Sequence, residues 1–168
     1  MITANITLGK EVSIEKDASI NNVTIGDGTK IASCVRVFGS PDHILEVGKG
    51  CYFGLNSIVE GYNAKVTIGN NVSFAQNVNL MSGSGPNASK VMQQLFPIEK
   101  GPVSIDDHSW IGASVIIMPN VSIGKYCIVA ANSFVNQSFP DYSIIGGTPA
   151  KLLRTLTQTE IDKLHSND

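Results

Sequence analysis

At 168 residues the chain is long enough for one domain, or for one domain with a small appendage. Apolar residues make up 42% and charged residues only 15%, so a core can form beneath an unusually neutral surface. The formal net charge of −2 argues against nucleic acid as a partner, because nucleic-acid binding needs a basic face.

The beginning of the chain, MITANITLGKEVSIEKD, has no basic segment followed by an apolar one, so we expect no signal peptide. No apolar run reaches about 18 residues, so we expect no membrane span. The three cysteines, Cys34, Cys51 and Cys127, lie far apart and form no CxxC pair. This pattern favours a reducing cytoplasm over a disulfide framework or a zinc site, and we expect no metal.

Apolar residues, which we call anchor residues, recur every six positions and form six triplets. The anchor residues are Leu8, Ile14 and Ile20; Ile25, Ile31 and Val37; Val47, Phe53 and Val59; Ile68, Phe74 and Leu80; Ile105, Ile111 and Ile117; Ile123, Val129 and Val135. Residues two positions earlier are nearly all small or β-branched, as expected where both side chains point inward from a short strand. Glycine often follows an anchor residue, where we expect a sharp turn with positive φ. Each triplet therefore predicts one triangular coil, and stacked coils bury a continuous core.

The spacing between triplets is irregular in one consistent way. Within triplets the step is always six residues, whereas between triplets it is 5, 10, 9, 25 and 6. The loops Phe38–Ile44, Glu60–Lys65 and Met81–Pro102 should therefore lie along one edge of the triangle, and such loops commonly form a solenoid's binding face. A β-sandwich would not keep its insertions in phase, so we predict an all-β solenoid of about six 18-residue coils over residues 1–149.

The tail after residue 149 breaks the six-residue period. Thr157 and Glu160 fit a capping box and are followed by a weak apolar stripe. We therefore predict a short α-helix and tail within residues 150–168 that cap the open end of the stack.

The C-terminal half of the repeat carries a family resemblance. The segment VSIDDHSWIGASVIIMPNVSIGKYCIVAANSFVNQSFPDYSIIGGTPAKLLR, Val103–Arg154, resembles the C-terminal block of the hexapeptide-repeat acyltransferases almost position for position. The branch it most resembles holds galactoside and maltose O-acetyltransferases, antibiotic acetyltransferases, and capsular or sialic acid O-acetyltransferases. The resemblance implies a left-handed parallel β-helix, acetyl-CoA as co-substrate, and a homotrimer with active sites between subunits. The handedness comes from the resemblance alone, because parallel crossovers are normally right-handed.

The resemblance also implies a cofactor site. The WIGA segment would place Trp110 near the pantetheine with Ala113 beside it, and the AANS segment adds Ala131. Asn136 and Gln137 occupy positions where the family often has threonine and lysine. Packing between coils is the other interpretation of Trp110, although its place directly before an anchor residue makes it point outward.

Two cations and one amide complete the implied binding site. Lys151 and Arg154, in GGTPAKLLR, would face the CoA phosphates, which favour cationic partners. The start of a solvated helix is the other interpretation of these two residues. Asn56 matches a position that contacts the acceptor sugar in the galactoside enzymes, and it fits a plain turn residue equally well.

The general base expected from the resemblance is missing. Acyl transfer to a hydroxyl needs a base, and histidine suits the role because its pKa lies near neutrality. In related enzymes it lies in the long loop, in a pattern like Gly-His-Pro. Here the pattern is Ser84-Gly85-Pro86, so Gly85 stands at this acceptor-facing position, and residues 81–102 contain no histidine.

His43 and His108 are the remaining candidates for the base, since His165 lies in a tail that we expect to be solvated. We favour His43, because its loop shares the corner of the long loop and lies two coils away, about 10 Å at ~4.8 Å per coil. The neighbouring Asp42 could orient its ring, as in other base–carboxylate pairs. His108, in DDHSWIG, fits a structural hydrogen bond at a corner as well as it fits a base.

A third interpretation needs no protein base. Positioning alone contributes much to transfer reactions, and backbone N–H groups of Ser82–Gly85 could stabilise the oxyanion. Ser82 or Ser84 as a nucleophile is less favoured, because no histidine lies near them in the sequence.

The leading hypothesis is a cytoplasmic O-acetyltransferase that moves acetyl from acetyl-CoA to a hydroxyl of a surface-polysaccharide or nucleotide-sugar precursor. An N-acetyltransferase of an amino sugar is the alternative, because an amine is already nucleophilic. A non-catalytic trimeric binding module without a base is a third hypothesis. The γ-type carbonic anhydrases share the β-helix but need three histidines on zinc, whereas only His43 and His108 lie within these coils, at different corners.

Overall fold

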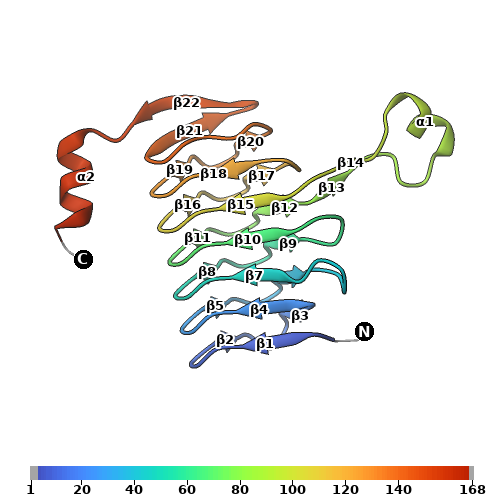
Figure 1. The fold of residues 1–168 in the computed structure, drawn as a ribbon, viewed down its shortest axis with the longest axis horizontal. Coiled ribbons are helices and arrows are strands. Elements are labelled where there is room, and N and C mark those ends of the chain that lie inside the picture. Colours follow the sequence, from blue (N-terminus) through green and yellow to red (C-terminus); the bar gives the residue numbers. More distant parts are fainter. Residues whose placement is uncertain (1–3, 167–168) are drawn as a thin grey trace.

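Three sheets, parallel except for the last strand of sheet B, form the faces of a triangular stack (Figure 1). The structure, a computed structural model, describes residues 4–166. Sheet A contains β1 (Ile6–Leu8), β4 (Val23–Ile25), β7 (Leu45–Val47), β10 (Val66–Ile68), β15 (Val103–Ile105) and β18 (Ser122–Ile123). Sheet B contains β2 (Ser13–Ile14), β5 (Lys30–Ile31), β8 (Tyr52–Phe53), β11 (Ser73–Phe74), β16 (Trp110–Ile111), β19 (Ile128–Val129), β21 (Ser143–Gly147) and β22 (Ala150–Thr155). Sheet C contains β3 (Ser19–Asn21), β6 (Arg36–Phe38), β9 (Ile58–Glu60), β12 (Asn79–Met81), β17 (Ile116–Ile117) and β20 (Phe134–Val135).

The chain visits sheets A, B and C in turn, so consecutive coils stack in register. In sheet A, for example, Ile25 aligns with Leu8 of the coil before it and with Val47 of the coil after it. Equivalent anchor residues therefore pair with one another along the whole stack. The predicted left-handed parallel β-helix of about six coils is confirmed.

The anchor residues form the core in the second to sixth coils, where all of them are buried. In the first coil Leu8 is 46% exposed and Ile14 is only half-buried, because no earlier coil within residues 4–166 covers them. At the centre, the rings of Phe53 and Phe74 are fully buried and stacked, with centroids 4.8 Å apart. Core packing at the centre thus rests on a pair of aromatic side chains from successive coils.

The glycines that follow anchor residues are required by close packing, and the expectation of positive φ at these positions was wrong. A Cβ on Gly48 would lie 2.5 Å from the carbonyl oxygen of Gly69 in the next coil. The left-handed backbone falls two residues later, at Gly50 with φ of 63° and at Asn71 with φ of 55°. Successive backbones therefore touch directly at the corner between sheets A and B.

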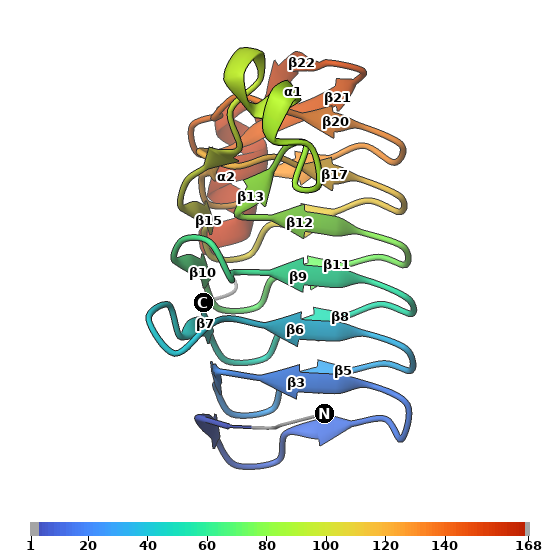
Figure 2. The ribbon, with the colours of Figure 1, turned by 90° about the vertical axis from the view of Figure 1, so that its right-hand side faces the viewer.

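All three insertions lie at the corner between sheets C and A, as the spacing predicts. Residues 39–44 connect β6 to β7, and residues 61–65 connect β9 to β10. Residues 82–102, which we call the arm, connect β12 to β15 and project away from the stack (Figures 1 and 2). This corner, the C–A corner, is therefore the irregular edge of the prism.

The arm has secondary structure of its own. Its two ends pair as the antiparallel strands β13 (Gly83–Ser84) and β14 (Glu99–Lys100). Its tip holds the helix α1 (Lys90–Leu95), capped by the side chain of Ser89, which accepts a hydrogen bond from the backbone N–H of Met92. The arm is thus a hairpin with a helical tip.

The C-terminal segment contains a strand as well as the short α-helix expected within residues 150–168. Its first part is strand β22, which pairs antiparallel with β21 and satisfies backbone groups at the edge of sheet B. Helix α2 (Gln158–His165) follows, and the predicted capping box of Thr157 and Glu160 is present. The helix lies beside the stack, and β22 lies at the end of the stack (Figure 1). Neither helix within residues 4–166 is long and apolar enough to cross a membrane.

The stacked phenylalanine pair provides a test of the core. We expect Phe74→Ala to lower the free energy of unfolding by about 3–5 kcal/mol, because it leaves a cavity against Phe53. Ser73→Ala, at the exposed neighbouring position of the same strand, should change it by less than about 0.5 kcal/mol. Urea denaturation of both variants measures the difference, and equal losses would contradict this description of the core.

Candidate functional site

The indole of Trp110 lies on the outer face of sheet B and is 54% exposed. It lines a pocket of about 370 Å³ with Ile128 and His108. Leu156 and Leu164, from the C-terminal segment, form part of the same lining. The pocket is within the range of ligand sites. Glu160 and Lys163 also line it, but most of its lining surface is apolar, so it suits an uncharged chain better than a charged group.

Ala113 and Ala131 lie one above the other at the corner between sheets B and C, the B–C corner. The backbone N–H of Asn132 donates to the carbonyl oxygen of Ala113 over 2.8 Å. Residues 112–114 and 130–132 carry no side chain larger than asparagine. A ligand can therefore approach the backbone closely at this corner.

Asn56 lies at the B–C corner of the third coil. Its φ of 60° is in the left-handed region, which asparagine tolerates better than most residues. Its backbone N–H donates to the carbonyl oxygen of Ser33 over 3.3 Å. This geometry accounts for the asparagine as a turn residue, while its proposed contact with an acceptor stays a prediction.

The ring of His108 belongs to an aromatic stack at the corner between sheets A and B. It lies flat on Tyr126, with ring centroids 4.9 Å apart, and Tyr126 lies on Tyr142 at 5.5 Å. His165 of α2 is exposed, as expected, and also meets Tyr126 edge-on, with its Nε2 3.1 Å from the hydroxyl of Tyr142. His108 therefore has a packing role, at a different corner from the one that carries the arm.

His43 lies at the C–A corner, as predicted, in the short loop 39–44. Reciprocal backbone hydrogen bonds of 2.9 and 3.1 Å join it to Ser40 and close the loop. The arm leaves the stack two coils further on and projects outward (Figure 2). Within one chain, the arm therefore does not cover His43.

Gly85 lies where the two sides of the arm pack together. A Cβ on Gly85 would lie 2.8 Å from the Cα of Ile98, so a side chain cannot be added without a backbone shift. This contact explains in physical terms why the arm has glycine where the resemblance implies histidine.

The root of the arm is held by Glu60, a residue that the sequence analysis did not single out. Its carboxylate accepts hydrogen bonds from the N–H and the hydroxyl of Ser82, at 2.9 and 3.1 Å. It also accepts the N–H of Tyr62 at 2.5 Å. The carbonyl oxygen of Ser82 accepts the N–H of Gly101 at 3.0 Å, so the carboxylate holds one end of the arm directly and the other end through Ser82.

Ser82 is fully buried, and its hydroxyl oxygen also accepts the N–H of Asn63 at 3.0 Å. Its N–H and hydroxyl are thus engaged in the scaffold, and neither is directed at a ligand. The sequence did hold a signal for this network: Glu60 is a charged residue at the end of a strand, beside two insertions.

Four implied cofactor residues lie near the end of the stack. The side-chain N–H of Gln137 donates to the carbonyl oxygen of Ala150 over 3.1 Å, which ties it to β22, while Asn136 is exposed beside it. Lys151 and Arg154 are both exposed on β22. Lys151 has no ion-pair partner among residues 4–166.

Arg154 is bound to Glu160 of α2 through two hydrogen bonds of 2.8 and 2.9 Å. The guanidinium, together with donors from Thr157, holds the pKa of Glu160 at about 2 instead of 4.5. The same pairing raises the pKa of Arg154. Arg154 therefore joins β22 to α2, and Lys151 is the cation that is more available to a ligand.

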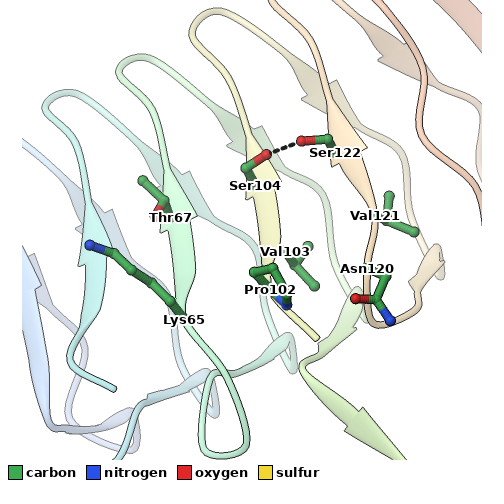
Figure 3. A pocket seen from close by; sticks show the side chains of 8 residues that line it. All are labelled: Lys65, Thr67, Pro102, Val103, Ser104, Asn120, Val121 and Ser122. Carbon is green, nitrogen blue, oxygen red and sulfur yellow. Dashed lines mark hydrogen bonds between the residues drawn. The ribbon is translucent and has the colours of Figure 1, made fainter. Parts of the chain in front are cut away.

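A polar groove on sheet A contrasts with the pocket on sheet B (Figure 3). Ser104 and Ser122 share a hydrogen bond between their hydroxyls, and Lys65 pairs with Glu46 at 2.8 Å. No histidine or carboxyl group lines the groove, and its one titratable side chain, Lys65, is held in the ion pair with Glu46. Among residues 4–166, no three histidine, cysteine, aspartate or glutamate side chains lie close enough together to hold a metal ion.

Comparison with known proteins agrees with this geometry. Residues 102–137 match the family model described as bacterial transferase hexapeptide (six repeats). YJL218W of Saccharomyces cerevisiae, named as a candidate acetyltransferase, is 35% identical over 170 residues, which cover 92% of this chain and 85% of that protein. The galactoside O-acetyltransferase of Escherichia coli is 32% identical over 139 residues, which cover 82% of this chain and 66% of the enzyme.

Among solved structures, the fold matches AntD, an N-acyltransferase from Bacillus cereus in complex with dTDP and 3-hydroxybutyryl-CoA. The TM-score is 0.81 at 23% identity, and the match covers 97% of this chain and 88% of that chain. At this identity the likeness concerns the fold alone.

The Glu60 network predicts how firmly the arm is held. We expect Glu60→Gln to raise the rate of tryptic cleavage at Lys90 and Lys100 by about tenfold or more, because an amide cannot accept all of the donors that meet the carboxylate. Glu46→Gln, at the exposed middle position of strand β7, should leave the rate at these two sites unchanged. Mass spectrometry of timed digests identifies the sites, and equal rates in both variants would refute the anchoring role.

The Arg154–Glu160 pair predicts a pH dependence for α2. Because the pKa of Glu160 is lowered from 4.5 to about 2, the pair stabilises the docked helix above about pH 4.5 and loses this contribution as the pH falls towards 2. Hydrogen exchange of residues 158–165 should therefore be faster in Arg154→Gln than in the wild type near neutral pH, and the two should converge at low pH. A difference that is as large at about pH 2 as near neutral pH would contradict the assignment.

Proposed function

Because this chain belongs to the hexapeptide-repeat acyltransferase family, we propose that it transfers an acetyl group from acetyl-CoA to a hydroxyl of a sugar. The acceptor would be a surface-polysaccharide or nucleotide-sugar precursor. One observation carries the proposal: the exposed indole of Trp110 lines an apolar pocket on the face that leads to the small-residue corner of Ala113 and Ala131. Such a surface suits the extended, uncharged pantetheine arm of CoA.

The CoA phosphates would lie towards the end of the stack, where β22 carries Lys151 and Arg154. We expect Lys151 to contribute more, because the charge of Arg154 is already shared with Glu160. The complex of AntD with 3-hydroxybutyryl-CoA supports an acyl-CoA as the donor in this fold.

The acetyl group would move in one displacement at the thioester. The acceptor oxygen attacks the carbonyl carbon and forms the new C–O bond while its proton passes to a base. The C–S bond then breaks, and the CoA thiolate leaves and takes up a proton. His43 is the proposed base, because it lies at the corner of the arm, whereas His108 is packed in the aromatic stack.

A homotrimer would complete the site, with the arm of one subunit reaching another. Three side chains of the arm support this arrangement, because Val91, Leu95 and Phe96 are 72%, 75% and 60% exposed. Large apolar residues that protrude together are typical of protein contacts. A second subunit could also bring an arm over His43, which the arm of the same chain does not do.

The proposed location is the cytoplasm. Cys34, Cys51 and Cys127 are all free, which fits a reducing compartment.

An amino sugar is the second candidate acceptor. The contact between Gly85 and Ile98 leaves no room for a histidine at position 85, residues 82–102 contain none, and an amine needs a weaker base than a hydroxyl does. AntD, named as an N-acyltransferase, shows that the fold occurs with this chemistry.

Acetyl transfer from acetyl-CoA to a panel of sugars and amino sugars tests the proposal. We expect His43→Ala to lower kcat by about 100-fold or more, and His108→Ala to act mainly on stability. Trp110→Ala should raise KM for acetyl-CoA and leave KM for the acceptor unchanged.

Full activity of His43→Ala would overturn the assignment of the base. If acetyl-CoA acetylates none of the acceptors in the panel, the proposed function is wrong. A product acetylated on nitrogen would select the second candidate.

A further inference from the structure

A pocket on sheet C has no role in the site described so far. It measures about 380 Å³ and lies on the face that Figure 2 presents, between β3, β6 and the loop 61–65. Its lining residues are Ser19, Asn21, Asn22, Arg36, Phe38, Gly39 and Tyr62. Its size fits a small ligand such as one sugar unit with a substituent.

Arg36 is the one charged residue that lines this pocket. It points outward from β6, since the next residue, Val37, fills the core. Within residues 4–166 its guanidinium has no hydrogen-bond or ion-pair partner. The planar guanidinium fork is suited to a carboxylate or a phosphate, which it binds through two parallel hydrogen bonds.

The remaining lining supplies aromatic surface and amide donors. Phe38 is half-buried and Tyr62 is 60% exposed, so both rings can offer apolar area to a sugar ring. Asn22 is only 5% exposed, and its Oδ1 accepts a hydrogen bond from Asn5 at 2.8 Å. The side-chain nitrogen of Asn22 has no hydrogen-bond partner among residues 4–166, and since no buried side-chain polar atom of these residues lacks a partner, this donor is open to solvent at the pocket.

The pocket is connected to the root of the arm. Tyr62, which lines it, donates its backbone N–H to the carboxylate of Glu60, the residue that anchors the arm. Arg36 lies in the second coil and the arm leaves the fourth, so about 10 Å separate them along the stack at ~4.8 Å per coil. One sugar with an acidic substituent can span this distance.

We propose that this pocket binds a carboxylate or phosphate group of the acceptor, with Arg36 as its anion-binding residue. The inference rests on the proposed function, and it narrows the acceptor to an acidic sugar: a sugar phosphate or a sugar acid. A neutral glycoside would lack the group that Arg36 recognises.

Titrations of the purified protein with glucose 1-phosphate, glucuronate and methyl glucoside test this, with calorimetry for affinity and the side-chain NMR signal of Arg36 for the site. We expect at least one acidic sugar to bind about tenfold or more tightly than methyl glucoside, and Arg36→Gln to remove that advantage. Whichever of glucose 1-phosphate and glucuronate binds more tightly shows whether the pocket prefers a phosphate or a carboxylate. The matched control is Lys30→Gln, an exposed cation of the same coil on sheet B, which should leave the affinities unchanged.

Equal affinity for the acidic and neutral sugars, or equal losses in Arg36→Gln and Lys30→Gln, would overturn the proposal. Thermal unfolding of both variants confirms that each remains folded. Binding of acidic sugars through Arg36 without any acetyl transfer would retain this site and reject the proposed function. Acetyl transfer that does not depend on Arg36 would reject this site and retain the proposed function.

Discussion

Backbone pairing between successive coils is the constraint on which the rest of the structure depends. Each coil must present its N–H and C=O groups to the next coil at ~4.8 Å, which leaves little freedom at two of the three corners. Gly48, for example, lies against the backbone of Gly69, with no room for an insertion. At the C–A corner, pairing resumes immediately beside each loop, as in the hydrogen bond of 2.8 Å from Gly61 to the carbonyl of Phe38.

Under the proposed function, this constraint separates the residues that would bind CoA from the base and the arm, which would act on the acceptor. The regular part of the fold carries Trp110 and the small-residue corner, whose geometry follows from strand pairing. The irregular edge carries His43, Glu60 and the arm, whose geometry follows from local hydrogen bonds. Under this proposal, the rigid coils of the solenoid would bind the co-substrate, which does not vary. The loops, which can vary, would bind the acceptor.

Which parts of the structure could be predicted from the sequence depends on the same difference between regular coils and irregular edge. The coils, the location of the insertions and the capping box at Thr157 could be predicted, because each depends on residues close together in sequence. Strand β22 could not be predicted, because it pairs with the backbone groups at the edge of β21, and that edge exists only in the folded stack. The network of Glu60 with Ser82 was equally hidden, since 22 residues separate its members.

The closure of the arm at Ser82 and Gly101 has a consequence for the evolution of the fold. Because the root is joined by its own hydrogen bonds, the segment beyond it behaves as a loop with fixed ends. Doubling the length of such a loop costs only about 0.6 kcal/mol of chain entropy. Homologous proteins could therefore lengthen, shorten or replace this segment with almost no change in stability, and acquire new acceptors while the coils stay as they are.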